Sequence, residues 1–389
     1  MLNKNEIVRY SRHLLLPEIG TEGQEKIKRA RVLVIGAGGL GCPALQYLTA
    51  MGVGEIGIAD FDKVDVSNLQ RQILYFVDDI GKLKAETAVS RLSRQNPFVK
   101  FNKYTVRLDN QNILDILSGY HVVIDGTDNF ATRYLVNDAC VIMNKPLIYG
   151  SIYKFEGQVS VLNFTDSSGN QGPTYRCLFP TPPLPGSVPG CSEIGVLGIL
   201  PGIIGTLQAA ETIKIITGIG NPLSGRLLLF DALAMSFSEL KIERNTGWIN
   251  NAPKSAAELA KTDYEYFCGN KTSESSIKSV SVETLRSILG NSSEIQLLDV
   301  REPFEEPQIN ELVDLQIPLG EIPDQAHLIS KSKKVIVFCR SGQRSKRAIE
   351  QLEKDFGYTN LHNLKGGIMA WTISSSNSPL KERGDMHSE

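Results

Sequence analysis

One short segment of the chain places a cysteine beside two arginines, in the order Cys339-Arg340-Ser341-Gly342-Gln343-Arg344. It follows an apolar run at 335–338, typical of a buried strand, and precedes a helical pattern at 346–356. Such a loop can turn backbone N–H groups toward a sulfur, while the helix N-terminus and the arginines favour negative charge. The segment therefore predicts a site that holds an anionic sulfur on Cys339.

A glycine-rich loop lies much earlier in the chain, with the sequence Gly36-Ala37-Gly38-Gly39-Leu40-Gly41. It falls between an apolar strand at 31–35 and an expected helix at 42–51. Its glycines can therefore bring the backbone close to phosphates at a helix N-terminus. Asp60 ends the next strand, where a carboxylate can bind ribose hydroxyls. These features predict a nucleotide site and, by default, a dinucleotide-dependent dehydrogenase.

Polar residues near the following strand ends argue against the dehydrogenase. The carboxyl ends of parallel strands meet at one edge of an open sheet. The residues that we expect at this edge are Asn68, Arg71, Lys84 and Asp128. Two cations and a carboxylate suit a triphosphate with Mg²⁺ better than a redox dinucleotide. Lys84 or Arg71 alone would be an ordinary surface charge, but their joint placement favours a nucleoside triphosphate.

The elements that would position these residues alternate between strands and helices. Further strands are expected at 55–60, 99–106, 121–125, 147–153, 158–164 and 226–230, and helices at 82–95, 109–118 and 203–217. The alternation up to residue 125 is typical of a Rossmann-like, doubly wound parallel α/β sheet. The strands at 147–153 and 158–164 follow each other closely, so they predict an antiparallel extension of that sheet.

We predict an α/β chain of two domains, a nucleotide-binding domain at 1–244 and a small α/β domain at 279–374. Residues 245–278 are polar with little periodicity, which favours a linker, and residues 375–389 are expected to form a flexible tail. A length of 389 residues is enough for two such domains.

Composition excludes several classes of function. The net charge of −2 gives no general attraction to nucleic acid or to anionic membranes. The most apolar stretch, 194–219, contains Gln208, Glu211 and Lys214, so we expect a turn and a core helix there and not a membrane span. The first residues lack the apolar run of a secretory signal, and the six cysteines form no CxxC pair. We therefore expect a cytoplasmic protein without a disulfide framework.

The first 240 residues resemble the ThiF/MoeB family, the ubiquitin-activating-like adenylyltransferases of sulfur-carrier proteins. The resemblance rests on Arg9-Tyr10-Ser11-Arg12, the glycine loop, Asp60-Phe61-Asp62, SNLQRQ at 67–72, Lys84 and Thr127-Asp128-Asn129. It implies a nucleotide site made of Gly36, Gly38, Gly39, Gly41, Asp60, Ser67, Asn68, Arg71, Lys84, Asp128 and Asn129. It further implies that Arg71 and Lys84 bind the phosphates of ATP and that Asp128 positions Mg²⁺. Arg12 would reach the phosphates in the other subunit of a homodimer.

The activity that this resemblance implies is adenylation of a small ubiquitin-like sulfur carrier. The C-terminal glycine carboxylate of the carrier attacks the α-phosphate of ATP, and pyrophosphate leaves. The protein contributes positioning and charge neutralisation, and no side-chain base is required because the attacking carboxylate is already ionised.

The cysteines depart from the pattern of this family, whose usual structural zinc site consists of two CxxC pairs. Only Cys177 and Cys268 stand near those places, so we predict no zinc. Cys42 and Cys140 lie in expected helices among apolar neighbours and are predicted to be core residues. Cys191 lies in the proline- and glycine-rich segment 172–201. It is either a loop residue without a role or a thiol that becomes linked to the carrier.

Residues 280–371 resemble the rhodanese sulfurtransferases. The matching motifs are Leu298-Asp299-Val300-Arg301-Glu302-Pro303, the Cys339–Arg344 loop and Gly366-Gly367-Ile368-Met369-Ala370-Trp371. Related phosphatases have one residue more between the cysteine and the arginine, so the shorter loop favours a sulfane sulfur over a phosphate ester. The usual glycine–histidine–isoleucine–proline stretch is replaced at 307–312, which leaves the sulfur donor open between a persulfide and thiosulfate.

The leading hypothesis is a bifunctional enzyme that activates a carrier as its acyl-adenylate and delivers sulfur to it from a persulfide on Cys339. The carrier could be the small subunit of molybdopterin synthase, our first choice, or a thiazole-forming or tRNA-thiolation carrier. In an alternative, the rhodanese domain is only a docking or sensing module. An NAD-dependent oxidoreductase is a third possibility, but it leaves Arg71, Lys84 and Asp128 unexplained.

Overall fold

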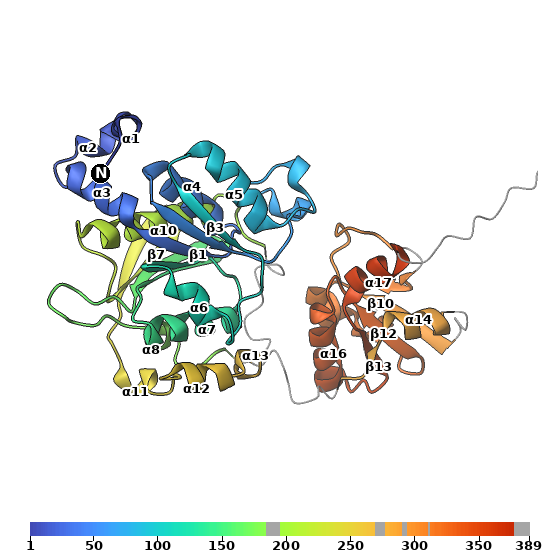
Figure 1. The fold of residues 1–389 in the computed structure, drawn as a ribbon. Coiled ribbons are helices and arrows are strands. Elements are labelled where there is room, and N and C mark those ends of the chain that lie inside the picture. The colour runs from blue at the N-terminus through green and yellow to red at the C-terminus, as the bar shows by residue number, and fades with distance from the viewer. Residues whose placement is uncertain (184–194, 269–276, 290–293, 310–311, 377–389) are drawn as a thin grey trace, which may run out of the picture. The chain divides into compact units, whose positions relative to one another are not determined.

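The structure is a computed structural model that describes residues 1–183, 195–268, 277–289, 294–309 and 312–376. The chain divides into two compact units, Met1–Asn270 and Lys271–Glu389. Each unit is built on its own β-sheet, with helices packed against it (Figure 1). This confirms the prediction of a doubly wound α/β fold followed by a small α/β domain.

The sheet of the first unit has the order β3-β2-β1-β4-β5-β6-β7-β8. Its strands are β1 (Arg31–Ile35), β2 (Glu55–Ala59), β3 (Lys100–Tyr104), β4 (Val122–Asp125), β5 (Leu147–Tyr153), β6 (Glu156–Leu162), β7 (Arg226–Asp231) and β8 (Ser236–Lys241). Strands β1 to β5 pair in parallel, whereas β6, β7 and β8 pair antiparallel, as the antiparallel extension predicts. The strand order reverses direction between β1 and β4, and ligands of open α/β sheets bind at such a point.

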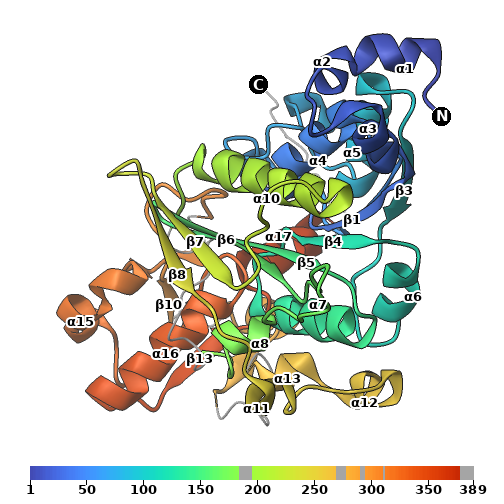
Figure 2. The same ribbon diagram turned by 90° about the vertical axis from the view of Figure 1, so that its left-hand side faces the viewer.

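The helices of this unit cover both faces of the sheet (Figure 2). They are α1 (Lys4–Arg9), α2 (Ser11–Leu14), α3 (Gly20–Arg29), α4 (Gly41–Met51), α5 (Lys84–Gln95), α6 (Ile113–Ser118), α7 (Phe130–Ile142), α8 (Tyr175–Leu178) and α10 (Leu200–Thr217). Two short 3₁₀ helices, η1 (Val66–Asn68) and η2 (Val77–Asp79), lie between β2 and α5.

Alternate residues of each central strand serve the two faces. Val32 and Val34 of β1 join the core beneath α4, α5 and α10, whereas Leu33 and Ile35 join the core beneath α6 and α7. Because successive side chains of a strand point to opposite faces, a strand that is covered on both sides needs a continuous apolar run. Cys42 and Cys140 are fully buried in these cores, which confirms the prediction made for them.

Helix α10 is held against the sheet by a buried amide. Gln208 Nε2 donates to the backbone oxygens of Asp125, at 2.7 Å, and Ile148, at 3.1 Å. These carbonyls belong to β4 and β5, next to the antiparallel extension, so the bonds fix the long apolar helix α10 at that part of the sheet. No helix in the described ranges combines the length and apolarity of a membrane span.

The segment that we predicted as a linker contains three short helices in its first part. These are α11 (Thr246–Ile249), α12 (Ala256–Lys261) and α13 (Tyr264–Phe267). Leu259, Tyr264 and Cys268 are buried in the core beneath α6 and α7, and the first unit accordingly extends to Asn270. The sequence gives little sign of this because each of these short helices buries at most one side chain, too few to produce a periodic pattern.

A buried ion pair clasps this extension to the first unit. Arg176 on α8 donates through Nε to Asp138 Oδ1 at 2.9 Å and through Nη2 to Asp138 Oδ2 at 2.7 Å. The Tyr264 hydroxyl donates to Asp138 Oδ2 at 2.8 Å, and the Arg176 guanidinium stacks over the ring of Phe267. Cys177 lies beside this clasp and accepts a hydrogen bond from the Asn245 N–H at 3.4 Å.

Replacing Asp138 with asparagine is expected to lower the free energy of unfolding by about 3 kcal/mol, because it leaves the buried Arg176 without a counter-charge. Urea unfolding of the full chain measures the loss. Glu243→Gln is the matched control, since Glu243 forms an exposed, water-screened pair with Lys241 whose loss should leave the stability nearly unchanged. Equal stability of Asp138→Asn and the native protein would show that the clasp does not stabilise the unit.

The second unit is a small parallel α/β fold with the strand order β11-β10-β12-β13-β9. Its strands are β9 (Ser279–Val280), β10 (Ile295–Asp299), β11 (Leu315–Gln316), β12 (Lys334–Phe338) and β13 (Leu361–Leu364). Its helices are α14 (Val282–Ile288), η5 (Leu319–Glu321), α15 (Ile322–Gln325), η6 (Ala326–Leu328), α16 (Gln343–Phe356) and α17 (Gly367–Ser376). Strand β12 is central and fully buried beyond its first residue.

Candidate functional site

The glycine loop links β1 to α4 at the point where the sheet reverses direction. Gly36 has a φ of +88°, a left-handed conformation that disfavours other residues. A Cβ there would lie 2.7 Å from the backbone oxygen of Gly126, so the loop packs directly against the end of β4. Gly41 begins α4 behind the loop. The backbone is thus held close to the sheet and leaves room for a ligand above it.

A pocket opens over this loop. The residues of the predicted nucleotide site that line it are Gly36, Gly38, Gly39, Asp60, Arg71, Lys84, Asp128 and Asn129. They come from the ends of β1, β2 and β4 and from the segment between β2 and α5. The structure therefore brings together side chains that lie far apart in the sequence, by the convergence of strand ends on which their prediction relied.

Asp60 connects the glycine loop to the end of β2. Its carboxylate accepts hydrogen bonds from the backbone N–H groups of Ala37 and Asp62, both at 2.8 Å. Burial raises the pKa of Asp60 above its ordinary value, and the charge of Lys84 opposes that rise. Lys84 is only 6% exposed, and its Nζ lies 3.1 Å from Asp62 Oδ2. A buried ammonium beside an exposed carboxylate is suited to a ligand that brings further negative charge.

The residues of the motif at 67–72 have two kinds of position: some line the pocket, and others stabilise the turn beside it. Arg71 is half-buried, lines the pocket and donates through Nη1 to the Ser67 backbone oxygen at 2.9 Å. Ser67 and Asn68 instead pair with Asp65 around η1: Asn68 Oδ1 accepts from the Asp65 N–H at 3.2 Å, and the Ser67 hydroxyl donates to its carboxylate. Within the described residues, neither Ser67 nor Asn68 lines the pocket.

Two further predicted residues have distinct positions. Asn129 lines the pocket but also caps α7, since its Oδ1 accepts from the Thr132 N–H at 2.9 Å. Arg12 lies exposed on α2 and, in the described part of the chain, does not line the pocket of its own subunit. Asp128 is exposed at the pocket rim.

The pocket is also lined by Gln72, Arg107 and Arg133, which were not among the predicted site residues. Arg133 is buried, donates to the Thr127 backbone oxygen at 2.9 Å and lies 3.9 Å from the buried carboxylate of Asp125. The rule of strand ends could have found Arg107, which follows β3, because the same rule selected Asp60. Arg133 depends on how α7 is rotated against the sheet, which its sequence does not reveal.

The second predicted site lies in the other unit, at the end of β12. Cys339 is 1% exposed, and its Sγ accepts a hydrogen bond from the Gly342 N–H at 3.2 Å. Gly342 has a φ of +88° and stands at the N-terminus of α16, which turns that N–H back toward the sulfur. The Ser345 hydroxyl lies 3.6 Å from the sulfur and 2.6 Å from Asn363 Oδ1, the better acceptor. The loop thus surrounds the thiol with polar groups, as predicted.

The first turn of α17 supports this loop from behind. The N–H of Ile368 donates to the Cys339 backbone oxygen at 2.9 Å, and that of Met369 donates to the Arg340 oxygen at 3.1 Å. Ser341 and Gln343 are exposed. Gln343 and Arg344 already belong to α16, which therefore begins earlier than the sequence suggests.

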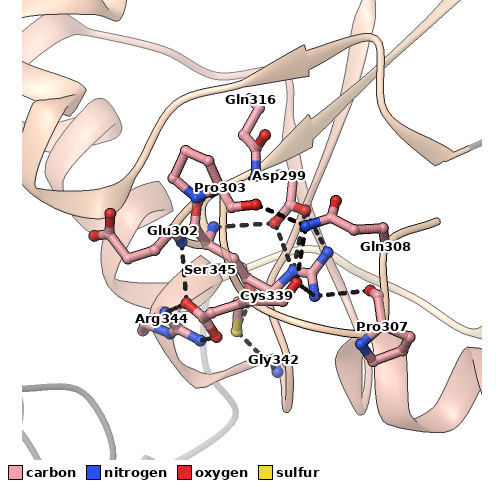
Figure 3. A network of polar contacts seen from close by, with 12 residues as sticks. Asp299, Glu302, Pro303, Pro307, Gln308, Gln316, Cys339, Gly342, Arg344 and Ser345 are labelled. Atoms are coloured by element: carbon pink, nitrogen blue, oxygen red, sulfur yellow. Dashed lines mark hydrogen bonds and ion pairs between the residues drawn. The ribbon is translucent and has the colours of Figure 1, made fainter. Parts of the chain in front are cut away.

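Arg344 has a partner that the sequence analysis did not identify. Its guanidinium forms a two-pronged ion pair with the carboxylate of Glu305, with Nη2 2.6 Å from Oε2 (Figure 3). Glu305 belongs to the segment after β10, which also contains Arg301 and Gln308. The sulfur loop is therefore flanked by a carboxylate as well as by its arginines.

Cys191, the second thiol of the predicted chemistry, lies outside the described residues. Cys268, like Cys177, is buried in the core of the first unit. In the ranges that the structure describes, no cluster of three or more potential metal-binding side chains is present.

Comparison with known proteins gives two family matches. Residues 10–249 match the ThiF family, and residues 281–374 match the rhodanese-like domain. A sulfur carrier protein adenylyltransferase of Thermus thermophilus is 52% identical over 269 residues, which cover 68% of this chain and 98% of the relative.

Other relatives match nearly the whole chain. The probable adenylyltransferase/sulfurtransferase MoeZ of Mycobacterium tuberculosis is 43% identical, with 95% of this chain and 94% of the relative covered. The adenylyltransferase and sulfurtransferase MOCS3 of Drosophila grimshawi is 40% identical, with 95% and 85% covered.

Among solved structures, Escherichia coli MccB has a TM-score of 0.53 at 22% identity, covering 62% of this chain and 71% of that protein. PaaA has a TM-score of 0.52 at 21% identity, with 62% and 75% covered. These two likenesses concern the fold alone. The family matches and the relatives of near-full length place the chain in the ThiF family, as an adenylyltransferase whose C-terminal rhodanese domain makes it a sulfurtransferase as well.

Proposed function

We propose that the enzyme uses ATP to adenylate the C-terminal glycine of a small ubiquitin-like sulfur carrier and transfers sulfur to it from a persulfide on Cys339. The observation that carries the first half is the joint presence of Arg71, Lys84 and Asp128 around the glycine loop of one pocket. The relatives support a sulfur carrier as the substrate, since the Thermus relative is named a sulfur carrier protein adenylyltransferase. We assign the two activities to domains at 1–244 and 279–374.

In the adenylation step, a carboxylate oxygen of the carrier forms a bond to the α-phosphorus of ATP. The bond from that phosphorus to the bridging oxygen breaks, and pyrophosphate leaves with the negative charge. Lys84 and Arg71 are the cations available in the pocket to offset this charge. The Asp60 carboxylate fixes the loop that would face the phosphates, so the site is organised before ATP binds.

We assign Mg²⁺ binding to Asp128. Its carboxylate is exposed at the pocket, and a carboxylate together with phosphate oxygens is a ligand set that suits Mg²⁺. When bound, Mg²⁺ would neutralise part of the phosphate charge. We also propose that the active enzyme is a homodimer in which Arg12 serves the partner's pocket, since Arg12 does not line its own within the described residues.

Removing the metal is expected to stop the adenylation reaction. EDTA should abolish carrier-dependent ATP–pyrophosphate exchange, and added Mg²⁺ should restore it. Asp128→Asn should raise the Mg²⁺ concentration at half-maximal exchange about tenfold, because it removes the charged ligand. Asp166→Asn, a change of the same kind at an exposed carboxylate of the same unit, should not. Exchange that survives EDTA would contradict a role for the metal.

In the sulfur step, the terminal sulfur of the Cys339 persulfide attacks the acyl carbon of the adenylate. A carbon–sulfur bond forms, the bond to AMP breaks, and AMP leaves. Release of the thiocarboxylate then requires a thiol that attacks the Cys339 sulfur and breaks the sulfur–sulfur bond. An external thiol can perform this attack: it forms a mixed disulfide with Cys339, and a second thiol molecule reduces that disulfide. We assign to Cys191 a covalent link to the carrier, and to a persulfide or thiosulfate the loading of Cys339.

The carrier that we favour is the small subunit of molybdopterin synthase, followed by a thiazole-forming or a tRNA-thiolation carrier, in the cytoplasm. ATP–pyrophosphate exchange with each purified carrier tests this directly. The preferred carrier should give the highest kcat/KM for exchange. If none of the three supports exchange, the adenylation of a sulfur carrier is wrong.

One observation favours the alternative in which the rhodanese domain only docks or senses. Cys339 is buried, and Arg344 is already paired with Glu305. In that case Cys339→Ala would leave thiocarboxylate formation at the native rate when an external persulfide is supplied.

A further inference from the structure

Arg344, the arginine at the end of the sulfur loop, is paired with the carboxylate of Glu305. Glu305 Oε2 accepts from Arg344 Nη2 at 2.6 Å, and the second nitrogen, Nη1, bonds the other carboxylate oxygen. The side chain of Arg344 is 14% exposed and that of Glu305 is 20% exposed, so water screens the pair only in part. A two-pronged pair of this kind uses the in-plane N–H groups of the guanidinium that would otherwise receive an anion.

Glu305 is held in this position by its own segment. Its Oε1 accepts from the Glu302 N–H at 3.0 Å, and its backbone oxygen accepts from Gln308 Nε2 at 3.0 Å. Arg301, which is completely buried against Asp299, donates to the backbone oxygens of Glu305 and Pro307 at 3.3 Å and 3.1 Å. The ion pair therefore joins two fixed elements, the segment 302–308 and the first turn of α16 (Figure 3).

The charge of this carboxylate persists at neutral pH. Burial raises the pKa of Glu305, but the hydrogen bonds from Arg344 and from the Glu302 N–H outweigh this and hold the pKa below its usual value. Glu305 thus stays ionised and paired above its ordinary pKa, and the pair is lost only as the pH falls through the lowered value. At neutral pH, the negative charge of Glu305 therefore offsets the positive charge of Arg344 at the rim of the loop.

The two candidate donors differ in how much they need this arginine. With thiosulfate, the Cys339 thiolate attacks the outer sulfur, a sulfur–sulfur bond to Cys339 forms, and sulfite leaves as a dianion. With a thiol persulfide, the same bond forms and a thiolate with a single negative charge leaves. A cation at the loop therefore assists thiosulfate more than a persulfide, and a carboxylate repels thiosulfate more.

We propose that Glu305 determines donor specificity at the sulfur site: by neutralising Arg344 it excludes small dianionic donors such as thiosulfate and leaves the site to persulfides. This proposal rests on the proposed function, in which Cys339 holds the transferred sulfur as a persulfide. It identifies a residue outside the cysteine loop as the one that decides which chemical class of donor loads that loop.

The test compares two donors in the full-length enzyme, thiosulfate and cysteine persulfide, with cyanide as acceptor. Glu305→Gln should raise kcat/KM for thiosulfate by about tenfold or more and change that for cysteine persulfide by less than about threefold. The ratio of variant to native activity should stay constant between about pH 6 and about pH 8, because the native carboxylate is ionised throughout. Glu302→Gln removes the same charge from an exposed position three residues away and should change neither value.

A double variant separates donor selection from a purely structural role. In an Arg344→Gln background, Glu305→Gln should no longer improve thiosulfate turnover, since the arginine that it releases is gone. Equal losses with both donors, or unchanged thiosulfate turnover in Glu305→Gln, would overturn the proposal. A native enzyme that accepts sulfur from neither donor, while pyrophosphate exchange is intact, would instead contradict the role of Cys339 itself.

Discussion

Replacing Arg71 with alanine is expected to lower carrier-dependent ATP–pyrophosphate exchange by about a hundredfold or more, while sulfur transfer from cysteine persulfide to cyanide keeps its native rate. Arg71 lines the nucleotide pocket from a half-buried position, and its guanidinium donates to the exposed backbone oxygen of Ser67. Its removal therefore takes a cation from the phosphates without leaving a buried group unpaired. Lys84 offers no such clean test, since it is buried beside Asp60 and Asp62.

Two companion variants make the result specific. Arg71→Lys keeps the charge but loses the planar fork, so it should recover part of the exchange activity. Arg94→Ala removes an exposed arginine from the end of α5, away from the nucleotide pocket, and should leave exchange unchanged. Equal loss of exchange and of sulfur transfer in Arg71→Ala would indicate misfolding or a wrong assignment of the pocket.

Replacing Cys339 with alanine is expected to remove persulfide formation and to lower sulfur transfer by about a thousandfold or more, since it removes the thiol at the end of β12 that would carry the sulfur. Exchange of pyrophosphate should keep its native rate, because the nucleotide pocket belongs to the other unit. Mass spectrometry of the loaded enzyme should place the additional sulfur atom on the peptide that contains Cys339.

The matched control for this variant is Ser341→Ala, which changes an exposed loop residue without removing the thiol. It should retain sulfur transfer within about threefold. A native rate of thiocarboxylate formation in Cys339→Ala would favour the docking or sensing role of the rhodanese domain.

The nucleotide site could be predicted from the sequence to a large extent, because its residues follow from the order of strands and turns. Asp60 and Asp128 come directly after β2 and β4, and the carboxyl ends of parallel strands meet wherever such a sheet forms. Ser67 and Asn68 belong to the same motif as Arg71 but stabilise a turn around Asp65. Sequence proximity alone did not separate these two roles.

The contacts that escaped prediction depend on tertiary packing. The pair between Glu305 and Arg344 joins two segments of the second unit. Neither segment has a sequence pattern that indicates contact with the other. Helices α11 to α13 are too short to show a periodic pattern, yet Leu259 and Tyr264 attach them to the core. Local sequence patterns thus indicated the candidate site residues. The residues that contact them depend on how the helices and strands pack together.

The clasp of Arg176, Asp138 and Tyr264 has a consequence for an enzyme that handles reactive sulfur. A structural site built from cysteine thiolates can be oxidised or persulfidated, and it then loses its grip on the fold. A guanidinium, a carboxylate and a phenol offer no thiolate to such reagents. A persulfide formed on Cys339 would therefore leave the contacts of this clasp unchanged.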